Sequence, residues 1–201
     1  MSDRTSDSST PKIGPSRYHY SVRILHWMMA LGFVMMFTSG AIMEYAEITK
    51  KLQFQMYQWH KSGGVLLLFA FCARVLFRLS LAIPNHLSGL TKFELGASKF
   101  VHKALYFLMV AIPLSGWLMV SASVFGLPTI VFGWFEWPHI PGVQGNNSVE
   151  DFAKTAHSWM VWIFAGIIVL HIAAALKHQL YRGYCKTRTL RCEMMRKLSV
   201  T

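Results

Sequence analysis

Charged residues are scarce in this chain of 201 residues. They make up 14% of it, whereas hydrophobic residues make up 53%. A soluble domain carries about 25% charged residues. Acidic residues are especially few, with nine Asp and Glu against 20 Lys and Arg. This composition argues against a soluble globular protein and favours a membrane protein with an excess of positive charge.

Common functional motifs are missing as well. The chain has no Cys-x-x-Cys-His motif, which excludes covalent attachment of a c-type haem, and no Walker or GxGxxG motif for nucleotides. None of its three cysteines, Cys72, Cys185 and Cys192, falls in a segment expected on the outer side of a membrane, so a structural disulfide is not expected. The first 23 residues are polar and lack the apolar core of a cleavable signal peptide.

Long apolar runs occupy much of the chain. A membrane-spanning helix needs about 20 apolar residues, and four segments meet this need: 24–43, 54–79, 104–135 and 156–176. The second contains Lys61 and Arg74, and the third holds a span followed by an apolar extension. We expect an all-α integral membrane protein, with a four-transmembrane-helix bundle at residues 17–183. A disordered polar segment (1–16) would precede it and a basic cytoplasmic tail (184–201) would follow.

The basic residues are distributed unevenly around these spans. Sixteen Lys and Arg lie in the N-terminal region, the middle connection and the C-terminal tail, and four lie on the opposite side. The positive-inside rule therefore places both termini and the middle connection in the cytoplasm. This membrane topology accounts for the excess of Lys and Arg. A nucleic-acid partner is not expected, because no basic stretch accompanies a binding motif.

Residues 129–142, TIVFGWFEWPHIPG, are apolar and aromatic but interrupted by Gly and Pro. We expect this segment to lie along the outer membrane interface as part of an aromatic belt. A lid over a site at the outer surface is the alternative.

Histidines recur at matching depths in three of the four spans. His157 and His171 are 14 residues apart in the fourth, which places them on nearly the same helix face and about 21 Å apart along the axis. His26 lies near the inner end of the first span, and His60 lies in the opening turns of the second. Depth therefore pairs His26 with His171 near the inner surface and His60 with His157 near the outer surface.

Two imidazoles at each of two depths suit two low-spin haems. Haem iron takes two axial ligands, and helical bundles supply such ligands from facing helices. A zinc or other divalent-cation site would prefer four ligands or added carboxylates, and the uncharged spans contain no Asp or Glu. The same absence weakens a proton relay. The pattern predicts two b-type haems per chain, with four axial ligands to iron: His26, His60, His157 and His171.

The interval of 14 residues recurs in the first two spans. It leads from His60 to Arg74, a cation for which a haem propionate at the inner depth would be an anionic partner. It also leads from His26 to Gly40, which leaves room for a planar group at the outer depth, as Gly64 could one turn after His60. His102 and His178 lie on the inner side. Either could bond a propionate or line a quinone pocket, but an interfacial position is the simpler interpretation of both.

Short motifs occur in order over residues 17–195: RILHWMMA, WHKSGG and HSW…LHIAAALKH in the first, second and fourth spans, with HKALYFLMVAIPLSGW and VFGWFEWP between them. The set resembles the bacterial cytochrome b561 family. These are small four-helix inner-membrane proteins with two b haems, related to the cytochrome b subunits of nickel–iron hydrogenases. The resemblance implies that the same four histidines bind the haem irons and that electrons are exchanged with the quinone pool.

The expected function is transmembrane electron transfer between ubiquinone or menaquinone and a donor or acceptor at the other face. Some members of the family are linked to superoxide oxidation, so superoxide and an extracytoplasmic redox protein are both candidates for that role. The chain is an oxidoreductase in the broad sense of an electron carrier, and enzyme activity is left open. Two alternatives stay open: a haem-containing membrane anchor for a soluble redox partner, and a histidine-based metal or proton transporter.

Overall fold

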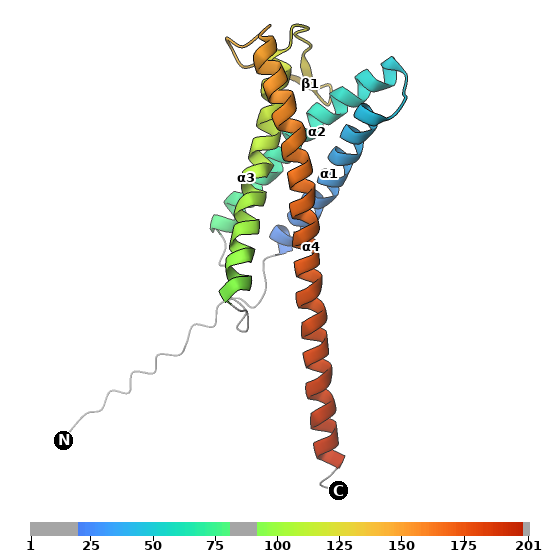
Figure 1. Ribbon diagram of the computed structural model, residues 1–201, viewed down its shortest axis with the longest axis vertical. Coiled ribbons are helices and arrows are strands. Elements are labelled where there is room, and N and C mark those ends of the chain that lie inside the picture. The colour runs from blue at the N-terminus through green and yellow to red at the C-terminus, as the bar shows by residue number, and fades with distance from the viewer. Residues whose placement is uncertain (1–19, 81–91, 199–201) are drawn as a thin grey trace, which may run out of the picture. The chain divides into compact units, whose positions relative to one another are not determined.

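The computed structural model describes residues 20–80 and 92–198, with the backbone alone for His178 and for 181–198. The expected polar segment 1–16 lies outside these ranges. The described part contains four helices and two short strands (Figure 1): α1 (Tyr20–Tyr45), α2 (Lys50–Ser80), α3 (Lys92–Ala122), β1 (Thr129–Val131), β2 (Phe135–Trp137) and α4 (Asn147–Leu198). It divides into two compact units. The first unit contains α1, α2 and the β1–β2 hairpin, and the second contains α3, α4 and the connections next to them.

All four helices are long and apolar enough to cross a membrane; in α4 the span covers Asn147–Lys177. Large apolar side chains point outward from each helix, including Trp27, Leu66, Phe107 and Trp159. A water-soluble protein would bury such residues, whereas lipid accepts them. The expected all-α membrane architecture with four spanning helices is therefore confirmed.

Helices α1 and α2 of the first unit pack closely because glycines line their contact. A Cβ atom added at Gly32 would lie 2.7 Å from Leu67 Cδ2, and one added at Gly63 would lie 2.8 Å from Met36 Sδ. At either distance the neighbouring side chain would have to shift, so glycine lets the helices approach without that displacement, as is common between membrane helices. Thr49 caps α2, where its Oγ1 accepts a hydrogen bond from the Leu52 amide at 3.3 Å.

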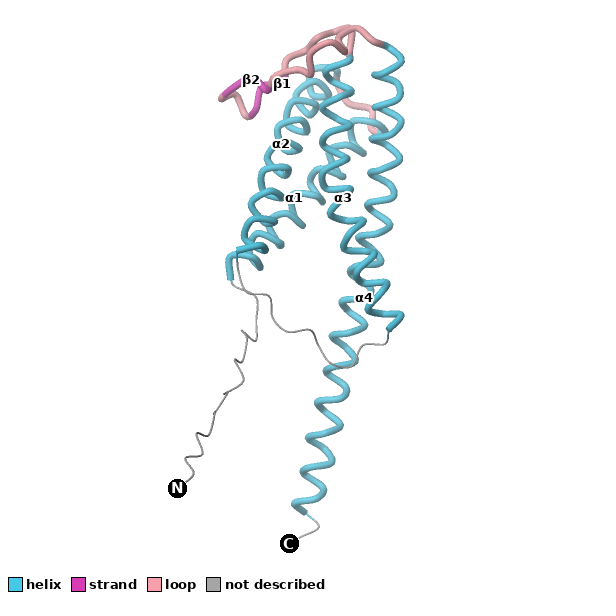
Figure 2. The backbone as a smooth tube through the Cα atoms, turned by 90° about the vertical axis from the view of Figure 1, so that its left-hand side faces the viewer, coloured by secondary structure: helices cyan, strands magenta, loops and turns pink. Residues whose placement is uncertain are grey.

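The apolar extension after α3 forms a small antiparallel hairpin (Figure 2). Thr129 pairs with Trp137 and Val131 with Phe135. At the turn, Phe132 and Gly133 have φ values of 48° and 80°, and the Trp134 amide donates to Val131 O at 3.0 Å. Positive φ at both central residues is the feature of a type I′ turn, which suits the twist of a two-stranded hairpin.

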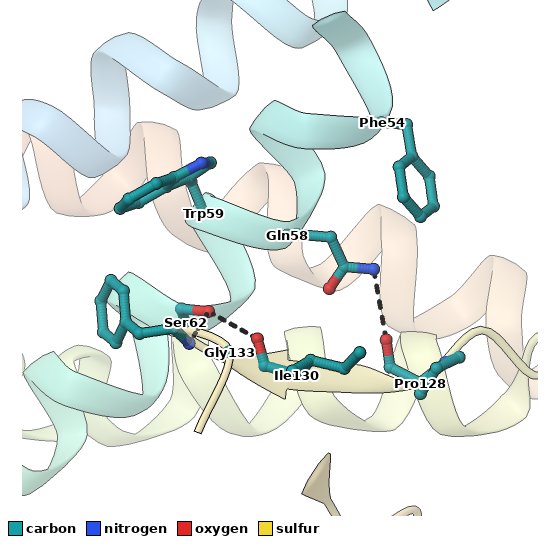
Figure 3. A pocket seen from close by; sticks show the side chains of 8 residues that line it. Phe54, Gln58, Trp59, Ser62, Pro128, Ile130 and Gly133 are labelled. Atoms are coloured by element: carbon teal, nitrogen blue, oxygen red, sulfur yellow. Dashed lines mark hydrogen bonds between the residues drawn. The ribbon is translucent and has the colours of Figure 1, made fainter. Parts of the chain in front are cut away.

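The hairpin is held on α2 by hydrogen bonds from three neighbouring side chains, two of which, Gln58 and Ser62, are drawn in Figure 3. Ser62 Oγ donates to Ile130 O at 3.1 Å and accepts from the Phe132 amide at 3.1 Å. Gln58 Nε2 donates to the carbonyl oxygen of Pro128 at 3.3 Å, and Lys61 Nζ donates to the same oxygen at 2.9 Å. The hairpin thus provides a partner for Lys61, one of the two basic residues inside the second expected span.

A cavity of about 320 Å³ lies between α2 and the hairpin, lined by aromatic rings and by Gln58 and Ser62. These two residues are each two positions from His60, so they face about 160° away from it around the helix. Within the first unit, the hairpin therefore packs on the side of α2 turned away from His60. That placement does not favour a lid over this histidine. The position of residues 129–142 in an aromatic belt at the membrane interface stays a prediction.

Replacing Ser62 with alanine is expected to lower the free energy of unfolding by about 1–3 kcal/mol, because Ile130 O and the Phe132 amide lose a buried partner. The measurement is denaturant unfolding of the purified chain in detergent. Ser80→Ala is the control, since Ser80 is an exposed serine in the same helix and its loss should change stability by less than about 0.5 kcal/mol. Equal stability of the two variants would contradict a stabilising role for this contact.

The second unit pairs α3 with α4. Asn146 Oδ1 accepts a hydrogen bond from the Val149 amide at 3.2 Å and caps α4. The Ile140 amide donates to Ser121 Oγ at 3.0 Å, which holds the connection against the end of α3. Helix α4 continues beyond its span to Leu198. Most of the expected basic tail, 184–201, is therefore helical in its backbone.

Candidate functional site

His60 in α2 faces α1 within the first unit. Its Nδ1 atom lies 2.9 Å from Ser39 Oγ. A Cβ atom added at Gly40 would lie 3.4 Å from its Cε1 atom. The imidazole therefore uses space that Gly40 leaves open, next to the serine that holds the ring. The sequence predicted room for a planar group beside Gly40, and the structure places the His60 ring itself there.

The hydrogen-bond directions indicate which nitrogen of His60 carries the proton. Ser39 Oγ donates its single proton to Met36 O at 3.0 Å, one turn earlier in α1. The hydroxyl can then only accept from His60, so Nδ1 carries the hydrogen and Nε2 carries the lone pair. This is the tautomer that binds a metal through Nε2.

His157 in α4 has the same environment in the second unit. Its Nδ1 atom lies 3.0 Å from Ser115 Oγ and 3.0 Å from Ile112 O, both in α3. A carbonyl oxygen can only accept, so Nδ1 must be the donor and Nε2 again carries the lone pair. Ser115 Oγ donates to Ile112 O at 2.7 Å. A Cβ atom at Gly116 would lie 3.3 Å from His157 Cε1.

Each unit thus contains a serine–glycine pair on one helix that supports a histidine on its neighbour. The serine and histidine are 21 residues apart in the first unit and 42 apart in the second. Because these separations differ, the two sites do not form a repeat of fixed spacing in the sequence. Ser39, Ser115 and Gly116 were missed as site residues. The signal that could have found them is a Ser-Gly dipeptide within an otherwise apolar span.

At the opposite end of the first unit, His26 lies in the second turn of α1. Arg74 Nη1 in α2 donates to Val22 O at 3.0 Å, and Val22 is one helical turn before His26. The structure therefore brings Arg74 to the part of α1 that carries His26, as the shared inner depth predicts. Its proposed contact with a propionate stays a prediction.

In the second unit, His171 packs against His102. Their ring centroids are 5.4 Å apart with an interplanar angle of 69°. Near this contact, Lys177 Nζ lies 3.1 Å from Glu94 Oε1 in an exposed ion pair that links α4 to α3. His102 thus contacts His171, one of the predicted iron ligands. The sequence did not predict this contact. The side chain of His178 lies outside the described atoms.

Two further predictions concern Gly64 and the pairing of the histidines. A Cβ atom at Gly64 would meet Met36 Cε at 3.7 Å, an ordinary contact with α1, so Gly64 is not shown to make room for a planar group. His26 and His60 belong to the first unit, whereas His157 and His171 belong to the second. The pairing of His26 with His171 and of His60 with His157 stays a prediction.

These residues fit haem better than a metal ion bound by protein alone. Among the side chains that the structure describes, no three His, Cys, Asp or Glu gather in a group that could hold a metal. Haem needs only two axial ligands, and a protonated Nδ1 held by an acceptor is the usual arrangement of a metal-binding histidine. Gly40 beside His60 and Gly116 beside His157 leave each ring space that any side chain would reduce.

Comparison with known proteins agrees with this chemistry. Residues 17–186 match the family model described as prokaryotic cytochrome b561. The chain is also 34% identical over 164 residues to cytochrome b561 homolog 2 of Escherichia coli strain K12, which covers 82% of this chain and 85% of that protein. The chain therefore belongs to the prokaryotic cytochrome b561 family of multi-pass bacterial membrane proteins, which use b-type haem for electron transfer.

Proposed function

We propose that this chain binds two b-type haems and carries electrons across the membrane between the quinone pool and a partner at the outer face. The observation that carries the proposal is the shared environment of His60 and His157. Each has its Nδ1 atom within about 3.0 Å of a serine hydroxyl, and an Nδ1–H donated to that hydroxyl leaves the lone pair on Nε2. That arrangement prepares an imidazole to bind iron through the distal ring nitrogen.

Each pair of histidines has a defined task in this proposal. His60 and His157 would hold iron at the outer depth, and His26 and His171 would hold iron at the inner depth, about 21 Å away along the helix axis. Bound haem would supply a one-electron couple at each depth. The surrounding apolar side chains exclude water, and the protein fixes ligand geometry and potential.

Arg74 is proposed to bind a propionate of the inner haem. A guanidinium has five N–H donors, so the bond to Val22 O leaves donor capacity for a carboxylate. An Arg74–propionate pair would give this half-buried cation the anionic partner that a membrane interior demands. The excess of Lys and Arg on this side of the chain supports a cytoplasmic location for both termini.

Quinol is the proposed donor or its quinone the acceptor, because a lipid-soluble carrier reaches the helices from the bilayer. Oxidation of one quinol to quinone releases two electrons and two protons, which matches two one-electron sites. At the outer face, superoxide or an extracytoplasmic redox protein would exchange electrons with the haem that His60 and His157 would hold. Superoxide oxidation yields dioxygen and one electron, so two such events reduce one quinone with two protons.

Stopped-flow mixing of the purified, oxidised chain with ubiquinol or menaquinol under anaerobic conditions tests this proposal. We expect the reduced alpha band of both haems to appear, and no change with a quinol dimethyl ether, which cannot donate electrons. Two haems reducible by dithionite but by neither quinol would favour a membrane anchor. No haem in the folded chain, with flux that depends on metal or pH, would favour the transporter.

A further inference from the structure

We propose that Ser39 and Ser115 are positioning residues that set the reduction potential of the outer haem by holding the Nδ1–H groups of its two histidine ligands. The inference rests on the proposed assignment of His60 and His157 to that haem. It goes beyond ligand identity, because it assigns a redox role to two serines on neighbouring helices. Each serine would act through its histidine and would not touch iron.

The same geometry occurs independently in both units. Ser39 Oγ and Ser115 Oγ lie 2.9 and 3.0 Å from the Nδ1 atoms of His60 and His157. Each hydroxyl also donates to the carbonyl oxygen three residues earlier, at 3.0 and 2.7 Å. That donation orients the hydroxyl so that its lone pair faces the imidazole. Two unrelated stretches of sequence reach one arrangement, which indicates a shared task.

The glycine after each serine completes the arrangement. A Cβ atom at Gly40 or Gly116 would lie 3.4 or 3.3 Å from the Cε1 atom of the histidine. At Gly116 this is tighter than most side-chain contacts, so the ring would have to shift if glycine were replaced. The serine therefore fixes the ring by a hydrogen bond, and the glycine gives the ring the space to be fixed there.

The chemical effect follows from the direction of the hydrogen bond. When Nδ1–H donates to an acceptor, electron density on the imidazole rises and Nε2 becomes a stronger donor to iron. A stronger donor stabilises the ferric state more than the ferrous state and so lowers the potential. Loss of the serine hydroxyl should therefore raise the potential of the outer haem. At His157, Ile112 O keeps part of the effect when Ser115 is replaced.

The experiment is a redox titration of the purified holoprotein with Ser39→Ala, Ser115→Ala and the double variant. The outer haem is identified as the component that His60→Ala removes. We expect two haems per chain in each variant and a higher potential for the outer haem alone. The shift should reach up to about a tenfold change in the ferrous-to-ferric ratio in the double variant, or about 59 mV for a one-electron couple. Ser39→Thr and Ser115→Thr keep the hydroxyl, so the outer haem should have the wild-type potential in both.

A second readout separates positioning from simple packing. The low-field g value of the ferric haem depends on the relative orientation of the two imidazole planes, so it should shift in the alanine variants and return in the threonine variants. Ser121→Ala is the control, because Ser121 is a buried serine of α3 that bonds the Ile140 amide and no histidine. Its potentials and g values should match the wild type.

An unchanged outer potential and g value in the double variant, with two haems retained, would overturn the inference and leave the di-haem proposal intact. Equal loss of both haems in the alanine variants without rescue by threonine would also overturn it, because the serines would then serve folding. A wild-type chain with fewer than two haems would instead contradict the proposed function.

Discussion

Replacing His60 or His157 with alanine is expected to halve the haem content of the purified chain, from two per polypeptide to one. Either change removes an axial ligand of the outer haem, and one remaining imidazole holds a buried b-type haem poorly because no covalent bond secures it. The inner haem should persist, since its ligands lie about four helical turns away. The measurement is pyridine haemochrome analysis per polypeptide.

Alanine variants of the other two histidines test the assignment of the inner haem. His26→Ala and His171→Ala should remove the other haem, so that the two classes retain reduced alpha bands of different position or potential. His139→Ala is the control, since this histidine lies after β2, outside the four helices, and its loss should leave both haems. Retention of two haems in His60→Ala and His157→Ala would show that these histidines are not required for binding either haem.

Replacing Gly116 with leucine is expected to remove the same haem as His157→Ala, although every histidine remains. A Cβ atom here would lie 3.3 Å from His157 Cε1 and 3.5 Å from Nδ1. The ring would give by a few tenths of an ångström for alanine, but the further carbons of leucine need the space that the imidazole occupies. Gly116→Ala should therefore keep two haems and shift one potential, whereas Gly116→Leu should keep one. Haem content and a redox titration distinguish the two.

Gly96→Leu is the matched control for this steric effect. Gly96 lies in the same helix, and no atom lies within 4 Å of a Cβ added there. Leucine is a better helix former than glycine by roughly 0.5–1 kcal/mol, so loss of helix propensity does not explain a defect at Gly116. If both leucine variants lose haem equally, the close contact at His157 is not the cause.

The sequence could predict the spans because a bilayer imposes a simple requirement, about 20 apolar residues in a helix. It could not predict where the helices begin and end. Helix α3 starts at Lys92, before the uncharged run that begins at 104, and α4 continues to Leu198. Lysine and arginine are good helix formers in water, so charge ends a span without ending a helix.

Helix periodicity also indicated that His157 and His171 share one helix face, since residues 14 apart return to one side, and depth paired them with His60 and His26. It could not indicate what holds them. The contacts of Ser39 and Ser115 join residues on different helices, and only the pairing of α1 with α2 and of α3 with α4 brings them together. The β1–β2 hairpin escaped prediction for a similar reason. Its strands are three residues each and depend on hydrogen bonds to α2.

The most direct test of the di-haem account is the haem content of the intact, purified chain, measured per polypeptide together with an equilibrium redox titration. The account predicts two b-type haems that titrate as two one-electron components, each lost separately when its histidine pair is broken. A single haem, or none in a chain that remains folded, would contradict it.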